Sequence, residues 1–178
     1  ALLADIVVKA LASLPIPKKM RWGSSREEFV RPVHWIVMLF GDEVLPATIL
    51  GIDSGKHSRG HRFMHDQTIE ISSPAQYEAL LEKAFVVVDY DARKEIIRRL
   101  VAEQGEQLGA TVIIEEDLLD EVTALVEWPV ALTGRFDEHF LSVPREALVS
   151  SLKSHQKCFY LLDEKEQLLP NFITVSNI

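Results

Sequence analysis

The chain has 178 residues and a formal net charge of −8, from 27 acidic and 19 basic side chains. Apolar residues make up 47% and charged residues 26%, proportions that are typical of a folded globular chain and exclude wholesale disorder. The acidic balance excludes a uniformly basic coat for nucleic acid but permits a local basic patch. No apolar run approaches the roughly 20 residues that span a bilayer. The single cysteine, Cys158, excludes an internal disulfide and a zinc site built from several cysteines, and it is compatible with a reducing compartment.

The first half of the chain predicts one helix and two strands. Apolar residues at helical spacing predict a helix within residues 1–17 that two prolines end, and this helix is compatible with membership of a neighbouring domain. The apolar run 33–40 predicts a central strand covered on both faces, and residues 44–52 predict a second strand. Residues 53–68 are basic, rich in histidine and predicted to be irregular.

The second half mixes helices and strands. Residues 73–76 have the pattern of a capping box and predict a helix over 74–83. Asp89 is expected to cap a helix that ends at Gly109 and has Glu95 and Arg99 as a surface pair. Because helices and strands do not alternate strictly, the pattern predicts an α+β fold with a mixed or antiparallel sheet, formed as one domain over residues 18–178. The remaining predicted elements are strands at 85–88, 111–114 and 130–133, helices at 117–126 and 144–152, and a hairpin of 157–162 with 168–175.

Both ends of the sequence suggest a piece of a longer protein. The chain begins with Ala1 inside a helical pattern and stops within an apolar, strand-like run. Natural termini are usually polar and frayed. We therefore expect the domain to be incomplete at its C-terminus.

Three histidines spaced four apart, His57, His61 and His65, would share one face of a helix, as metal ligands can. The glycines among them argue against a helix there, and the neighbouring cations would repel a divalent ion. We therefore expect no metal site.

The same stretch is better interpreted as an anion-facing loop. Arg59 and Arg62 can each form a forked pair of hydrogen bonds with a phosphate, and Gly60 allows a close backbone approach. Phe63 is expected in the core, with stacking on a base as the alternative. An ordinary solvated basic loop is an equally good interpretation.

Two further basic clusters accompany this loop. Lys153, His155 and Lys157 lie where a helix passes into a strand, and their chemistry suits a phosphate backbone, although cations at a helix C-terminus also have a purely structural explanation. Residues 18–22 form a third group that contains three cations and Trp22. In a net acidic chain this positive charge must be local, so we expect the clusters to form one electropositive side that faces RNA.

No credible nucleophile is visible. Cys158 is expected to be a buried structural thiol, and no serine lies in a Gly-x-Ser-x-Gly elbow. The sequence also lacks a phosphate-cradling glycine loop and a dinucleotide fingerprint. Glu127 and Trp128 form an unusual corner before Pro129; we favour a packed structural corner over a reactive carboxylate.

Six motifs occur in this order along the chain: Met20–Gly23, Phe29–Trp35, Arg59–Phe63, Leu118–Pro129, His155–Lys157 and Leu169–Asn177. Together they resemble the β subunit of bacterial glycine–tRNA ligase over nearly the whole chain. Two departures stand out: Met64-His65-Asp66 replaces a His-His-Pro run, and Cys158 replaces an aromatic residue. They weaken a role for His65 and argue against a stacking ring at position 158.

The resemblance implies a cytoplasmic class II synthetase, usually α2β2, that joins glycine to tRNA(Gly) with ATP and Mg²⁺. The adenylate site would belong to the α subunit, so this portion should need no cofactor of its own. Its partners would be tRNA(Gly), the α subunit and the remainder of the β subunit, with no membrane. The resemblance also implies a B3/B4-type domain, which in the phenylalanine enzyme hydrolyses mischarged tRNA.

Two hypotheses follow for this portion. In the first, it is non-catalytic and contributes tRNA binding or subunit architecture. In the alternative, it is an aminoacyl-tRNA editing hydrolase, with His61, His155 and Glu127 positioning a water. We favour the first, because glycine is the smallest substrate and larger amino acids can be excluded sterically at the synthetic site. The expected tRNA contacts are Arg59, His61, Arg62, Lys153, His155 and Lys157.

Overall fold

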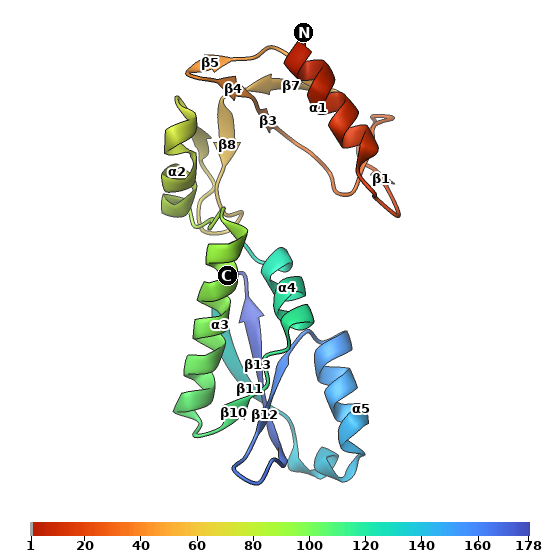
Figure 1. The fold of residues 1–178 in the computed structure, drawn as a ribbon, viewed down its shortest axis with the longest axis vertical. Helices are drawn as coiled ribbons and strands as arrows, with labels where there is room; N and C mark the ends of the chain where they lie inside the picture. The colour runs from red at the N-terminus through yellow and green to blue at the C-terminus, as the bar shows by residue number, and fades with distance from the viewer. Residues whose placement is uncertain (1) are drawn as a thin grey trace. The chain divides into compact units, whose positions relative to one another are not determined.

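The computed structural model describes residues 2–178, which form two compact units that divide between Ala84 and Phe85 (Figure 1). The first unit contains an N-terminal helix, several very short strands and a second helix. Its elements are α1 (Leu2–Ser13), β1 (Met20–Arg21), β2 (Glu28–Phe29), β3 (Ile36–Val37), β4 (Leu39–Phe40), β5 (Glu43–Val44), β6 (Thr48–Ile49), β7 (Ile52–Gly55), β8 (His57–Arg59), β9 (Thr68–Glu70), the 3₁₀ turn Pro74–Gln76 and α2 (Tyr77–Lys83).

The prediction of one continuous buried strand over 33–40 is wrong, because the chain changes partners at Met38. Strand β3 pairs in parallel with β7, whereas β4 forms an antiparallel pair with β5. Between them, the Met38 N–H donates to Gly55 O at 3.1 Å and Met38 O accepts from Leu45 N at 3.0 Å. Since each partner covers only part of the run, Phe40 is 70% exposed. The predicted strand 44–52 is likewise replaced by three short strands, since β5, β6 and β7 each cover only part of it.

The prediction that residues 53–68 are irregular is also wrong for their first part. Strand β8 pairs antiparallel with β9 and places Ser58 in the interior between two exposed neighbours. A small hydroxyl residue in the buried register position gives no apolar alternation, so the sequence pattern does not reveal the strand.

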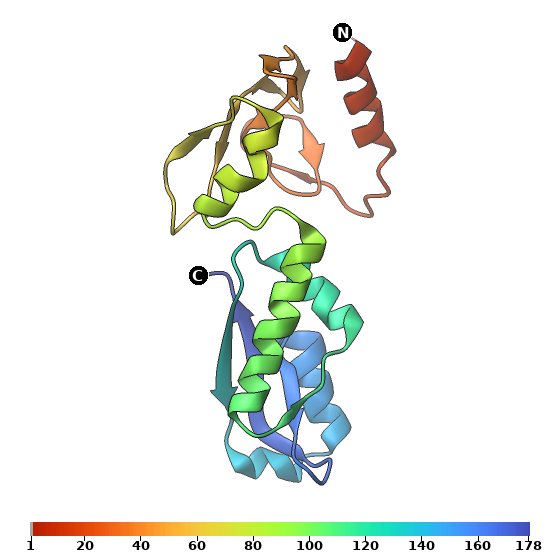
Figure 2. The ribbon, with the colours of Figure 1, turned by 60° about the vertical axis from the view of Figure 1, so that its left-hand side comes forward.

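The second unit has a four-stranded antiparallel sheet in the order β10-β12-β13-β11. The views agree that helices α3 and α5 lie on opposite sides of this sheet (Figures 1 and 2). The elements are α3 (Tyr90–Gln107), β10 (Thr111–Val112), α4 (Glu116–Leu125), β11 (Val130–Arg135), the 3₁₀ turn Glu138–Ser142, α5 (Arg145–Ser150), the π-helical turn Ser151–His155, β12 (Phe159–Leu162) and β13 (Leu168–Ser176).

The core of the second unit lies between the sheet and helices α3 and α4. Apolar positions on one face of each helix meet inward-facing residues of β12 and β13, which removes them from water. The fully packed members are Ile97, Val101, Leu118, Leu119, Val122, Val126, Phe159, Leu161 and Ile173. The hairpin of β12 and β13 was predicted from the sequence and is confirmed.

Residues 85–88 do not form the predicted strand. Phe85 has a φ of +61°, and the carbonyls of Val87 and Val88 both accept from the Arg93 guanidinium, the latter at 3.3 Å. The Val87 N–H donates to Glu127 O at 2.9 Å. Since the backbone groups are bonded to a side chain and to the turn after α4, none of this segment joins the sheet.

Helix boundaries agree closely with the sequence, although some local contacts differ. Asp89 caps α3 as predicted, accepting from Ala92 N at 2.7 Å. The capping box at 73–76 does not form, because the Ser73 side chain makes no capping bond and a 3₁₀ turn precedes α2. Arg99 pairs with Glu103 at 3.0 Å instead of Glu95, which is 3.3 Å from Arg98.

The α+β class with mixed and antiparallel sheets is confirmed. The division after Ala84 does not coincide with the expected boundary near residue 17, so the grouping of 18–178 as one domain stays a prediction. Among residues 2–178, no helix is both long enough and apolar enough to cross a membrane.

Replacing Leu119 by Ala should destabilise the second unit. The side chain is fully buried in the core, and a Leu→Ala change there costs roughly 2–5 kcal/mol of unfolding free energy through lost burial and the cavity left behind. The matched control is Leu125→Ala on the same helix, where the side chain is 59% exposed and the change should cost less than about 1 kcal/mol. Urea denaturation followed by circular dichroism measures both; equal losses would contradict the assigned core.

Candidate functional site

A cleft of about 850 Å³ in the first unit contains most of the predicted anion-facing loop. Strand β8 provides one wall and the turn that follows it provides another, while the segment before β3 supplies an indole. The lining is His34, Trp35, His57, Ser58, Arg59, Gly60, Arg62, His65, Asp66 and Thr68. The cleft therefore combines cationic, imidazole and aromatic groups with a single carboxylate.

Arg59 and Arg62 rest against aromatic rings. The Arg59 guanidinium carbon lies 6.0 Å from the centre of the Trp35 ring, and that of Arg62 lies 5.8 Å from the centre of the Phe63 ring. Within residues 2–178 neither arginine forms an ion pair, and both side chains are exposed. A cation over a ring keeps its charge, so both guanidiniums remain able to bind an anion.

Lys56 differs from these two arginines because it forms an ion pair with a carboxylate. Its ammonium lies 2.6 Å from Glu70, and this pair, chiefly through the hydrogen bond from Lys56, lowers the pKa of the Glu70 carboxyl. The positive charge at Lys56 is therefore already compensated.

His61 and Gly60 have structural roles in the loop. His61 is 1% exposed, and its Nδ1 accepts from the backbone N–H groups of Phe63 and Met64, both at 3.3 Å. A Cβ on Gly60 would lie 2.5 Å from the Ala84 Cβ and 2.6 Å from its carbonyl oxygen. The close backbone approach expected at Gly60 is thus toward Ala84, and the expectation that Phe63 lies in the core is wrong, since this ring is 74% exposed.

The three-histidine metal alternative gains no support from the geometry. In the part of the chain that the structure describes, no group of three or more His, Cys, Asp or Glu residues is arranged to hold a metal ion. His57 is on β8, whereas His61 and His65 lie in the following turn, where the His65 N–H donates to His61 O at 2.9 Å.

The second predicted cluster is neutralised by carboxylates. Lys153 forms ion pairs with Glu115 and, at 3.0 Å, with Asp117, and these hydrogen bonds raise its pKa. Lys157 lies 2.8 Å from Glu121, while His155 is exposed at the end of the π-helical turn. Contact of any of these side chains with tRNA stays a prediction, but a phosphate would have to displace carboxylates at both lysines.

Charge divides unequally between the units. Residues 1–84 contain ten basic and ten acidic side chains, whereas residues 85–178 contain nine basic and seventeen acidic ones. The whole net charge of −8 therefore falls in the second unit, and a polyanion is electrostatically better accommodated on the first.

Glu127 and Trp128 form the structural corner that the sequence favoured. Their backbone N–H groups both donate to the Asn177 side-chain oxygen, at 2.8 and 3.0 Å. The Trp128 ring meets Phe85 edge to face with centroids 5.4 Å apart. These contacts give the backbone of both residues and the indole a structural role, whereas the Glu127 side chain is exposed and its role stays a prediction.

Comparison with known proteins supports the sequence motifs. The family described as "Glycyl-tRNA synthetase beta subunit" matches residues 1–178. The chain belongs to this family. Relatives named "Glycine--tRNA ligase beta subunit" include those of Chromohalobacter salexigens, 56% identical over all of this chain, Hahella chejuensis, 51% identical over 99% of it, and Pseudomonas putida strain W619, 52% identical over all of it. In each case the match covers 26% of the relative, so the chain spans about a quarter of the length of these proteins.

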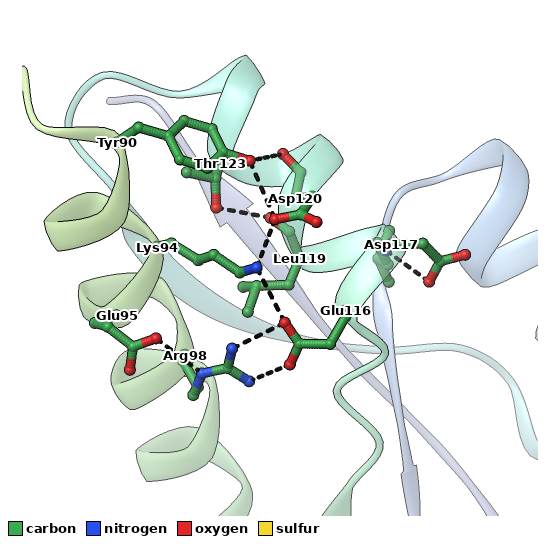
Figure 3. Close-up of polar contacts among 10 residues, drawn as sticks. Tyr90, Lys94, Glu95, Arg98, Glu116, Asp117, Leu119, Asp120 and Thr123 are labelled. Atoms are coloured by element: carbon green, nitrogen blue, oxygen red, sulfur yellow. Dashed lines mark hydrogen bonds and ion pairs between the residues drawn. The ribbon is translucent and has the colours of Figure 1, made fainter.

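In this member of the glycyl-tRNA synthetase β-subunit family, the densest polar network joins α3 to α4 (Figure 3). The Arg98 guanidinium holds both oxygens of Glu116, at 2.7 and 3.0 Å, and Lys94 lies 3.0 Å from Glu116 and 2.6 Å from Asp120. The hydrogen bonds from Arg98 first, then Lys94, lower the pKa of Glu116 to about 2, and Asp120 and Glu116 raise that of Lys94 to about 12. The network fixes the helices that cover the core.

Sequence reasoning missed this network. The sequence does place two cations, Lys94 and Arg98, one turn apart on the same helix face. Their carboxylate partners could not be predicted, because they depend on how α3 and α4 are oriented toward each other. Cys158 agrees with its prediction: it is buried, and burial raises the pKa of its thiol.

Substituting Gly60 by Ala should distort the cleft. The added Cβ would overlap Ala84, so we expect a loss of roughly 1–3 kcal/mol in unfolding free energy. Gly55→Ala is the control, since a Cβ there meets no atom of residues 2–178 within 4 Å and needs no left-handed backbone. Thermal unfolding measures both variants. A stable Gly60→Ala chain would contradict the packing of the loop on Ala84.

The α3–α4 network should make folding sensitive to acid. Because the folded pKa of Glu116 is about 2, below its ordinary value of 4.5, its stabilising contribution is present above pH 4.5 and disappears as the pH falls toward 2. Glu116→Gln should therefore lower stability at neutral pH and flatten its decline over that window. Glu106→Gln on α3 removes the same charge from an exposed site without an ion pair to residues 2–178 and should leave the profile unchanged. Identical acid profiles for both variants, by urea denaturation, would refute the role of Glu116.

Proposed function

We propose that this chain is the tRNA-binding portion of a glycine–tRNA ligase β subunit. The complete enzyme would be a cytoplasmic class II synthetase, organised as α2β2, that joins glycine to tRNA(Gly) with ATP and Mg²⁺. The family assignment supports the ligase. In this proposal the α subunit forms the adenylate, so the present portion performs no chemistry and needs no cofactor, and its partners are tRNA(Gly), the α subunit and the rest of β.

One observation carries the proposal: Arg59 and Arg62 project from a cleft of about 850 Å³ with no carboxylate partner among the described residues. A guanidinium binds phosphate oxygens through two parallel hydrogen bonds, and an uncompensated one gains most from doing so. The neighbouring imidazoles of His34 and His57 add hydrogen-bond donors to the same lining.

In this proposal the second unit does not bind tRNA but has an architectural role. Its lysines at 153 and 157 are bound to carboxylates, and its net charge repels phosphate. We therefore assign the second unit to subunit architecture and place the RNA contact on the first.

The test is a pair of double variants in the assembled enzyme. Arg59→Ala with Arg62→Ala should weaken tRNA(Gly) binding and reduce the slope of log K against log salt by about one to two, since each phosphate contact contributes about 0.7–0.9. Lys153→Ala with Lys157→Ala removes the same charge from neutralised positions and should leave that slope nearly unchanged. Fluorescence anisotropy over a salt series measures both.

The result that would overturn the proposal is equally specific. If the arginine variant bound tRNA(Gly) with the affinity and salt slope of the unsubstituted enzyme, the cleft would not be an RNA contact. A larger slope change in the lysine variant would move the contact to the second unit.

A further inference from the structure

A second cleft adjoins the basic one within the first unit. It has a volume of about 450 Å³ and is mainly apolar and aromatic. Trp35 and Ser58 line both clefts, so the two share a wall. The lining of this aromatic cleft is Trp35, Val37, Leu39, Ser58, Ile71, Pro74 and Tyr77.

The aromatic cleft presents ring surface to solvent. Trp35 is 42% exposed and Tyr77, the first residue of α2, is 36% exposed. Large rings left open beside a lined cavity favour a ligand that offers a flat apolar face. The Arg59 guanidinium over the Trp35 ring joins this surface to the cationic one.

Ser58 supplies a polar group at the shared wall. The residue is only 5% exposed and lines both clefts, and its hydroxyl is not among the buried side-chain atoms that lack a hydrogen-bond partner within residues 2–178. A hydroxyl can both donate and accept a hydrogen bond, so it suits a polar ligand atom at this wall.

We propose that the joined clefts hold one unpaired nucleotide of the bound RNA. The inference rests on the proposed function and deepens it. The base stacks on Trp35 or Tyr77 in the aromatic cleft, Ser58 bonds an edge of the base or the ribose, and the phosphate lies against Arg59 and Arg62. A nucleotide within a duplex has both faces covered by its neighbours, so only an unpaired one can supply the ring face that this cleft needs.

The test uses variants of the assembled enzyme that keep apolar volume but lose the ring. Trp35→Leu and Tyr77→Leu should each weaken tRNA(Gly) binding at least about fivefold, the lower end of the loss seen when a stacking ring is removed. The salt slope should stay at the wild-type value, because no charge changes. Tyr77→Phe keeps the ring and should bind like the wild type. A short unstructured RNA should compete with tRNA(Gly) on the wild type better than on Tyr77→Leu, and a blunt duplex of equal length should compete equally on both.

Three outcomes would contradict the nucleotide site. Wild-type affinity in both leucine variants would overturn it, as would an equal loss of competition by duplex and unstructured RNA. A lower melting temperature of the assembled enzyme with unchanged tRNA affinity would show that another part of the protein covers the rings. If the Arg59 and Arg62 double variant still weakened binding and reduced the salt slope, the proposed function would stand and only the nucleotide site would fall.

Discussion

Carboxylates on and just before α4 determine where positive charge is available in this chain. Glu115, Glu116, Asp117, Asp120 and Glu121 bind cations of α3 and of the segment that follows α5. The lysines and arginines of the second unit are therefore largely occupied within it, although the sequence contains them in number. Arg59 and Arg62 rest on rings instead of carboxylates, so an incoming polyanion meets both at full charge.

Much of the second unit follows from the sequence because its elements are long and strongly patterned. Helix α3 (Tyr90–Gln107) is capped by Asp89 and is followed by the left-handed Gly109, and both features lie where predicted. The first unit was less predictable because its strands are two to four residues long. At that length the partner of each strand decides its extent, as Met38 shows by passing from one partner to another.

The candidate site was predictable as a set of residue types but not as an arrangement. Clusters of arginine, lysine and histidine are visible in a sequence, whereas the carboxylates that neutralise Lys153 and Lys157 lie more than 30 positions away. Burial likewise separates His61 from the exposed Arg59 and Arg62, although all three lie within four consecutive residues. Only the fold distinguishes a cation free to bind RNA from one already bound.

The Glu127–Trp128 corner and the Arg59–Phe63 segment consequently have different explanations. Glu127 and Trp128 direct their backbone N–H groups to Asn177, and the indole packs on Phe85, so this motif holds a corner together. In Arg59–Phe63 the histidine and glycine also hold the backbone, but they do so while both arginines and the phenylalanine face solvent. Burying His61 and packing Gly60 against Ala84 fixes the backbone between Arg59, at the end of β8, and Arg62, in the turn that follows. Such fixation lowers the entropy lost when a phosphate is bound, since the guanidiniums already stand on a rigid backbone.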